Sequence, residues 1–169
     1  MGKTFEGYPE ITKEEINKAL DFCNRQILHI LPEFTDKFQQ AYSVDGFYPP
    51  IENVDWTTGF WTGEIWLAYE YTHDERLLKA AQVQVHDFKN RIDKKISVDH
   101  HDMGFLYSPS CVAAYKLTGN EEGKEAAIKA ADQLREEILA MGEEIYMHPE
   151  TGYREFHTTE LVADKLEKL

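Results

Sequence analysis

One sequence pattern occurs twice and decides the fold: residues 59–72 read GFWTGEIWLAYEYT, and residues 104–118 read GFLYSPSCVAAYKLT. Both segments open with Gly-Phe, carry alanine and tyrosine in their second half, and end in threonine. Equivalent positions lie 45 or 46 residues apart. A repeat of this length is typical of stacked supersecondary units, none of which can bury its apolar face alone.

A second predicted helix follows each copy of the pattern. A helix over residues 60–71 leads through Thr-His-Asp to the first of these, and a helix over residues 104–117 leads through Thr-Gly-Asn to one over residues 121–140. Their apolar stripes are Leu77, Leu78, Ala81, Val85, Phe88 and Ile92, and Ala127, Ala130, Leu134 and Ile138. The sequence therefore predicts an all-α fold of repeated helical hairpins, arranged as an array or a closed ring.

Two further segments precede the repeats. Thr12 and Glu15 have the spacing of a capping box, and apolar residues follow at helical spacing as far as Pro32, which predicts a first helix with one apolar face. Residues 32–58 break both the helical and the strand period and contain Asp-Gly and Pro-Pro pairs. We expect a long loop there, packed by its own aromatic residues.

The composition limits the partners. The 169 residues carry a formal net charge of −13, which disfavours nucleic acid and anionic membrane surfaces. No apolar run approaches the ~20 residues needed to span a bilayer, and no basic segment near the start joins an apolar stretch. These features predict a cytoplasmic protein without a nucleic-acid or membrane partner.

The two cysteines lie far apart and form no CxxC pair. Cys23 and Cys111 both fall in predicted helices among apolar neighbours, so neither a zinc pattern nor a disulfide framework is indicated. We expect both to be buried thiols.

Two segments, residues 53–63 and 98–107, stand out as the candidate site because both lead into the first helix of a pair. Equivalent ends of successive hairpins face the same side, so their side chains should gather at one mouth. The residues expected there are Trp56, Phe60, Trp61, Trp66, His100, His101 and Asp102. Indole walls with a few carboxylates and imidazoles suit a sugar, whose C–H face stacks on aromatic rings while its hydroxyls take charged hydrogen-bond partners.

Each candidate also has a structural interpretation. Trp66, inside a helix, is expected in the core, whereas Trp56, in a loop before a glycine, fits either role. Asp102 stands where a helix cap would stand. The His-His-Asp run could ligate a metal, but adjacent residues seldom all bind one ion and no distant His/Glu cluster is obvious, so we predict no metal site. No surrounding signal accompanies His29, His73, His86, His148 and His157.

Three segments carry a resemblance to a known family: DGFYPP (residues 45–50), NVDWTTGFWTGEIWLAYEYT (53–72) and VDHHDMGFLYSPSCVAAYKLTGNE (98–121). They resemble the unsaturated glucuronyl hydrolases, glycoside hydrolases that remove Δ4,5-unsaturated glucuronic acid from lyase-generated glycosaminoglycan oligosaccharides. The likeness covers residues 11–134. It implies a six-hairpin (α/α)6 toroid with its active site at the mouth formed by the hairpin loops.

The resemblance also implies roles for particular residues. Asp102 matches the family's general acid/base, which protonates C4 of the enol ether and activates the water that attacks C5. His101 and Trp56 match positions that line the subsite for the unsaturated sugar, and we expect Trp61 and His100, from the same two segments, to contact substrate too. This hydration chemistry requires no cofactor, because one tuned carboxylic acid can supply the proton.

The chain also departs from the family's pattern. It holds fewer than half of six hairpins, and a second active-site aspartate before an apolar segment is not found. We therefore expect an incomplete toroid over residues 1–142, a segment unlike the family over 143–169, and self-association through unpaired helix faces. The alternative function is a non-catalytic helical-repeat module that binds a glycan or a peptide.

Overall fold

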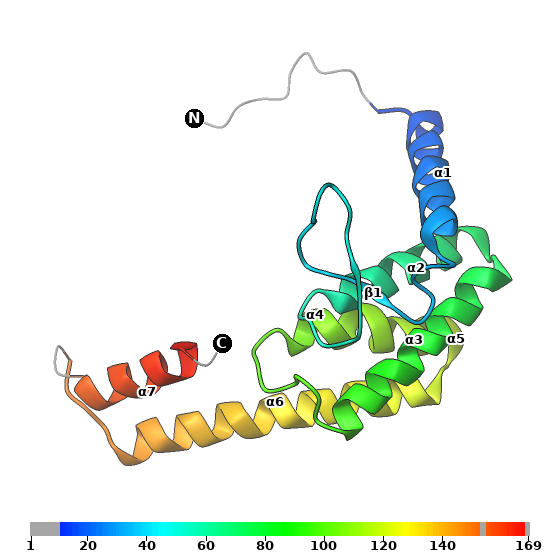
Figure 1. Cartoon of the computed structure of the whole chain (residues 1–169). Coiled ribbons are helices and arrows are strands. Elements are labelled where there is room, and N and C mark those ends of the chain that lie inside the picture. Colours follow the sequence, from blue (N-terminus) through cyan, green and yellow to red (C-terminus); the bar gives the residue numbers. More distant parts are fainter. Residues whose placement is uncertain (1–10, 153–154, 168–169) are drawn as a thin grey trace.

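The structure is a computed structural model that describes residues 11–152 and 155–167. Its elements in chain order are α1 (Lys13–Ile30), β1 (Phe38–Gln39), β2 (Pro50–Ile51), α2 (Thr58–Thr72), α3 (Glu75–Asp93), α4 (Met103–Tyr107), the π-helical turn η1 (Ser108–Val112), α5 (Ala113–Thr118), α6 (Glu121–Met147) and α7 (Phe156–Glu167). Figure 1 shows α2 to α5 and the start of α6 packed together, with α1 at one end and α7 beyond the other. The predicted helical fold is confirmed.

The first helical pair consists of α2 and α3, joined by a turn that the chain forms with local hydrogen bonds. Thr72 Oγ1 donates to the carbonyl of Ala68 at 2.7 Å, and His73 adopts a left-handed conformation with φ of 55°. The Asp74 carboxylate then accepts the N–H of Arg76 at 2.8 Å and caps α3. The chain therefore reverses over two residues.

The second pair repeats this turn. Here the first helix is continuous through α4, η1 and α5, and the second is α6. Thr118 Oγ1 donates to the carbonyl of Ala114 at 2.7 Å, Gly119 takes the left-handed position with φ of 70°, and Asn120 accepts the N–H of Gly123 at 2.8 Å to cap α6. The predicted repeat is confirmed down to its turn chemistry.

The two pairs meet along a line of close backbone contact. A Cβ atom on Gly59 of α2 would lie 2.2 Å from the carbonyl oxygen of Phe105 and 2.7 Å from the Cα of Leu106, both in α4. One turn further, a Cβ on Gly63 would lie 2.8 Å from the Cβ of Pro109. These glycines let α2 lie directly against the first helix of the second pair. Pro109, which has no N–H to donate, lies in the π-helical turn η1.

The core is apolar with one polar network at its centre. Its largest fully buried side chains include Trp61, Trp66, Phe38, Phe88, Ile65, Leu77 and Leu106. Gln84, fully buried on α3, accepts from Thr62 Oγ1 at 2.7 Å and donates to the carbonyl of Phe34 at 2.7 Å. The amide thus connects the segment after α1 to both helices of the first pair. Its hydrogen bonds within the protein take the place of those that it would make with water in the unfolded chain.

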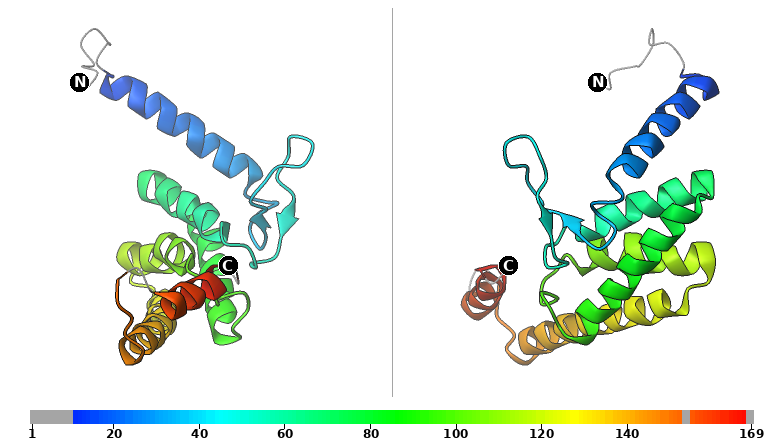
Figure 2. Two further views of the ribbon diagram at one scale, coloured as in Figure 1. Left: turned by 90° about the vertical axis from the view of Figure 1, so that its left-hand side faces the viewer. Right: turned by 45° about the vertical axis from the view of Figure 1, so that its right-hand side comes forward.

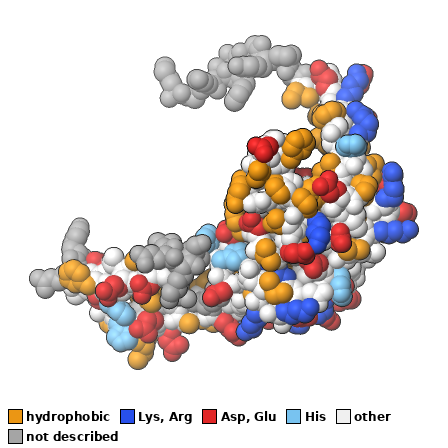
Figure 3. Space-filling model, viewed as in Figure 1, with side chains coloured by type: hydrophobic (Ala, Val, Ile, Leu, Met, Phe, Trp, Pro, Cys, Tyr) orange, Lys and Arg blue, Asp and Glu red, His pale blue; other side chains and the backbone are white. Residues whose placement is uncertain are grey.

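The predicted loop over residues 32–58 is more ordered than expected. Strands β1 and β2 pair antiparallel, and beyond them Val44 and Phe47 exchange backbone hydrogen bonds of 2.7 and 3.0 Å. Asp45 and Gly46 between them both have positive φ, the signature of a type I′ turn. Figure 3 shows hydrophobic side chains gathered over this hairpin.

The C-terminal part also differs from expectation. Helix α6 was expected to end near residue 140 but runs to Met147, and it passes through Gly142 without a break, so no element ends at the division drawn between residues 142 and 143. Helix α7 was not expected at all. The right-hand view in Figure 2 shows α6 extending beyond the other paired helices, with α7 lying near its far end.

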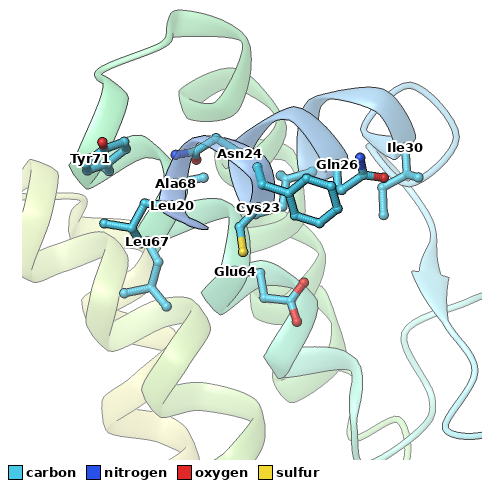
Figure 4. Close-up of a pocket in the computed structure, with 11 residues that line it drawn as sticks. Leu20, Cys23, Asn24, Gln26, Ile30, Glu64, Leu67, Ala68 and Tyr71 are labelled. Carbon is cyan, nitrogen blue, oxygen red and sulfur yellow. The ribbon is translucent and has the colours of Figure 1, made fainter. Parts of the chain in front are cut away.

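Helix α1 begins with the predicted capping box but leaves part of its apolar face uncovered. It packs on α2, and between them lies a groove of about 490 Å³. The groove is lined by residues that include Leu20, Cys23, Ile27, Leu67 and Tyr71 (Figure 4). The expectation that both thiols are buried is therefore wrong for Cys23, which is exposed beside this groove, and right for Cys111.

Candidate active site

The loops that precede the two helical pairs bring an aromatic cluster to the surface. The rings of Trp56, Phe60 and Phe105 lie with centroids 5.5 to 6.3 Å apart, and each side chain remains at least two-fifths exposed. Trp56 comes from the first loop, Phe60 from α2 and Phe105 from α4. The repeat therefore places equivalent loop ends together, as expected.

Trp61 and Trp66 lie elsewhere. Trp61 is only 2% exposed, and its indole N–H donates to the carbonyl of Phe34 at 2.9 Å. Its predicted contact with substrate does not fit this position, because the ring packs edge-on against Phe34 and its polar atom is already used. Trp66 is 1% exposed, as predicted for a core residue.

Asp102 occupies the N-cap position of α4, but its side chain makes no capping hydrogen bond. The carboxylate is instead flanked by two imidazoles: His101 Nε2 lies 3.3 Å from Oδ1, and His100 Nδ1 lies 3.9 Å from Oδ2. About one-fifth of the side chain is accessible to solvent. A carboxylate at this position that does not cap its helix is free to exchange a proton with a bound molecule.

His101, which contacts this carboxylate, also borders a hollow of about 690 Å³. Its lining comprises Phe60, His101, Gly104, Phe105, Ser108 and Pro109. Two of the three clustered rings thus border the same hollow as His101. The hollow offers an aromatic wall and an imidazole within one space.

His100 has a different place from the one predicted. Its Nδ1 accepts the backbone N–H of Asp102 at 3.2 Å, and its Nε2 contacts the carbonyl of Ser97 at 3.0 Å. Since Nδ1 accepts, Nε2 carries the proton and donates it to Ser97, which defines one neutral tautomer. Both ring nitrogens of His100 are thus bonded within the loop, and one of them holds the backbone of Asp102.

Arg91 of α3 connects the two loops of the site. It was not identified as a site residue from the sequence. It is 2% exposed. Its guanidinium donates to Ile96 O at 3.1 Å, Ser97 O at 2.6 Å, Asn53 Oδ1 at 2.8 Å, Asp55 O at 2.9 Å and Thr58 Oγ1 at 3.1 Å. One buried cation thereby holds the loop that carries Trp56 and the loop that carries His100 and Asp102.

Burial shifts the proton affinity of the groups around this tie. Removal from water lowers the pKa of Arg91, and the same cause raises the pKa of Tyr107, whose hydroxyl donates to the carbonyl of Phe88 at 3.1 Å. One sequence signal could have indicated that Arg91 is buried. It directly precedes Ile92, which belongs to the apolar stripe of a predicted helix.

Exposed aromatic rings and a carboxylate that does not cap its helix, both at the loop end of helical hairpins, suit a carbohydrate-binding site. The family model for Glycosyl Hydrolase Family 88 matches residues 28–160, and the chain belongs to this family. The match continues past residue 142, into the segment expected to be unlike the family.

Named relatives agree. The chain is 42% identical over 149 residues to the unsaturated chondroitin disaccharide hydrolase of Streptococcus pneumoniae, covering 88% of this chain and 38% of that protein. The crystal structure of unsaturated glucuronyl hydrolase from Streptococcus agalactiae has a TM-score of 0.74 at 41% identity, over 76% of this chain and 32% of that one. A variant of the same enzyme complexed with dGlcA-GalNAc6S has a TM-score of 0.75 at 41% identity, over 77% of this chain and 34% of that one.

The chain thus spans less than two-fifths of the length of these relatives. The solved enzymes confirm that its helical pairs are part of an (α/α)6 toroid. Across the described ranges, every helix is too short or too polar to cross a membrane.

Proposed function

We propose that this chain supplies the Asp102 side of an unsaturated glucuronyl hydrolase site, which acts on Δ4,5-unsaturated glucuronyl oligosaccharides from glycosaminoglycans. The observation that carries the proposal is the Asp102 carboxylate, which stands at a helix N-terminus without capping it and contacts His101 at 3.3 Å. The aromatic cluster, two rings of which border the same hollow as His101, suits the flat, unsaturated sugar ring. The relatives' names give the substrate class.

The chemistry is hydration of an enol ether. Asp102, as the acid, donates a proton to C4 of the C4–C5 double bond, and the positive charge that develops at C5 is shared with the ring oxygen. The resulting carboxylate then takes a proton from the water that adds to C5. The hemiketal opens at the C5–O5 bond, and collapse at C1 releases the neighbouring sugar as an alcohol. One water is consumed, and Asp102 ends in its starting state.

The neighbouring side chains have distinct parts in this step. His101, which borders the hollow and is largely exposed, orients the acid and donates to the sugar. Trp56 provides a stacking surface. His100 and Arg91 are positioning residues, since they act through the backbone of the two loops. No cofactor is needed, because the proton and the water complete the balance.

The test is the ultraviolet absorbance of the C4–C5 double bond, followed with an unsaturated chondroitin disaccharide and the purified chain. We expect the absorbance to fall, and Asp102→Asn to slow its fall by about 10²–10⁴-fold. Asp99→Asn is the matched control, because it removes the same charge from an exposed site in the same loop. Binding without loss of absorbance would overturn the enzymatic proposal in favour of a non-catalytic glycan-binding module.

We further propose that a second copy of the chain covers the groove between α1 and α2. Leu67 is exposed in this groove, and Ile16 is exposed on the adjoining face of α1. Apolar surface of this kind is normally buried. Light scattering on the samples used for the absorbance assay should show an oligomer as concentration rises. A monomer throughout the range would overturn self-association. A cytoplasmic location stays a prediction from the sequence.

A further inference from the structure

The far end of α6 and the start of α7 bring together three side chains that have no part in the site around Asp102. Glu144 lies in the last turn of α6, His148 is the residue directly after that helix, and His157 is the second residue of α7. Figure 1 shows α7 lying back alongside the end of α6, beyond the paired helices. The three side chains therefore form one cluster, although the two histidines lie nine residues apart in the sequence.

The potential ligand atoms of this cluster converge. His148 Nδ1 lies 3.1 Å and His157 Nε2 lies 3.2 Å from the same oxygen, Oε1 of Glu144. The three ligand atoms all lie within 4.8 Å of one another, and the two imidazole centroids are 5.0 Å apart. Bonds of about 2.0–2.1 Å in a tetrahedral zinc site place neighbouring ligand atoms about 3.4 Å apart. The cluster needs only small side-chain rotations to reach that spacing.

The position of His157 is fixed independently of the cluster. The Glu150 carboxylate accepts the N–H of His157 at 2.8 Å with one oxygen and the N–H of Thr158 at 2.7 Å with the other. It thereby caps the first turn of α7 and holds the backbone that carries the imidazole. A ligand whose backbone is already held loses less conformational entropy when it binds an ion.

Hydrogen bonding alone is the competing explanation. Glu144 could accept a hydrogen bond from each imidazole, and His148 Nδ1 also lies 3.2 Å from the carbonyl of Glu144. That arrangement would hold the helices together without an ion. It differs from a metal site in a measurable way, because it gives no specific affinity for a transition metal.

We propose that Glu144, His148 and His157 bind a zinc ion that fastens α7 to α6. Two imidazole nitrogens and one carboxylate oxygen form a ligand set that zinc accepts, with a fourth position open to water. All three side chains are 40 to 59% exposed, so an ion reaches them from solvent. The ion binds where the sequence alone predicted no metal.

Isothermal titration of the tag-free, chelator-treated full chain with Zn²⁺ tests the proposal. We expect one ion per chain, and His157→Gln and His148→Gln should each weaken binding by more than about 100-fold, since even partners outside the ligand set are worth about 10–100-fold. His86→Gln is the matched control. His86 is exposed on α3 and contacts Glu122 at 2.7 Å, and within residues 11–152 and 155–167 this His–Glu pair has no third ligand beside it. Its loss should leave binding unchanged.

Hydrogen exchange supplies a second measurement that does not depend on affinity. Zn²⁺ should slow amide exchange in residues 156–167 of the wild-type chain and leave the same amides unaffected in His157→Gln. The proposal is overturned if Zn²⁺ does not bind saturably, or if the His148 and His157 variants bind it as well as His86→Gln does. It is also overturned if Zn²⁺ leaves the rate of amide exchange in α7 unchanged. Each variant changes an exposed side chain, and the circular dichroism spectrum of each should show that the protein keeps its helices.

Discussion

The paired helices between residues 58 and 134 and the helices that flank them use the same local signals but differ in what they bury. Helix α3 begins with an Asp cap and has Leu77, Val85 and Phe88 fully buried. Helix α1 begins with a complete capping box, yet Ile16 and Leu20 on its apolar face are 48% and 40% exposed. Capping and periodicity determine where a helix forms, whereas burial depends on whether a partner helix is present.

The two thiols offer the largest measurable contrast between these regions. Cys111, in η1 among the paired helices, is completely buried, and burial raises its pKa from about 9 to about 12. This cuts the thiolate fraction about 1000-fold relative to an ordinary thiol. We expect a thiol reagent near neutral pH to modify Cys23 of α1 rapidly and Cys111 at least about 1000-fold more slowly, as measured by mass spectrometry of the separated peptides.

The control for this contrast is the unfolded chain. In denaturant both thiols should react at similar rates, because the difference arises only from packing. Two thiols that react equally fast in the native chain would show that the second helical pair opens readily, and the contrast with α1 would then be wrong.

Two arginines sharpen the comparison within one helix. Arg91 makes five hydrogen bonds in the interior, whereas Arg76 pairs with Asp74 at the exposed start of α3. Arg91→Met should destabilise the chain by about 3 kcal/mol, because buried carbonyls and Asn53 lose their donor. Arg76→Met should leave the urea midpoint nearly unchanged, since exposed ion pairs contribute little.

Arg91→Met should also affect the site. This second effect distinguishes a residue that links the two loops from one that only packs in the core. The variant releases both loops, so a lower affinity for the unsaturated disaccharide is expected at concentrations of urea where the chain remains folded. Equal loss of stability in the two arginine variants would show that the guanidinium is not the link between the loops.

Much of the helical framework could be predicted because its determinants are local. The 45-residue repeat, the caps and the turn residues all act over a few positions, and Asp102 was placed at a helix start for the same reason. The tryptophans show the limit. Helix α2 is buried on several sides, so no single stripe distinguishes Trp61 in the core from an exposed position, and neighbouring helices decide the outcome.

The parts that could not be predicted depend on contacts between distant segments. Arg91 lies among other cations in the sequence, with Lys89 and Lys94 close by, and it links the loops at residues 53–58 and 96–97 only when they meet around it in the fold. Likewise, the rings of His148 and His157 come within 5.0 Å of each other in the fold, where Glu150 accepts the N–H groups of His157 and Thr158. Residue spacing alone predicts neither the approach of the two loops to Arg91 nor the approach of His148 to His157.

Two glycines give the smallest expected effect and the most direct test of the comparison. Gly59→Ala places a methyl group against the backbone of α4, which cannot move aside, so we expect a loss of about 2–3 kcal/mol in the free energy of unfolding. Gly142 lies in α6 beyond the paired helices with open space around its Cα, so Gly142→Ala should stabilise the chain by about 0.5–1 kcal/mol through helix propensity. Urea unfolding followed by circular dichroism measures both. If Gly142→Ala also destabilised the chain, the end of α6 would be packed against something, and the contrast between the paired helices and their flanks would not extend to this end.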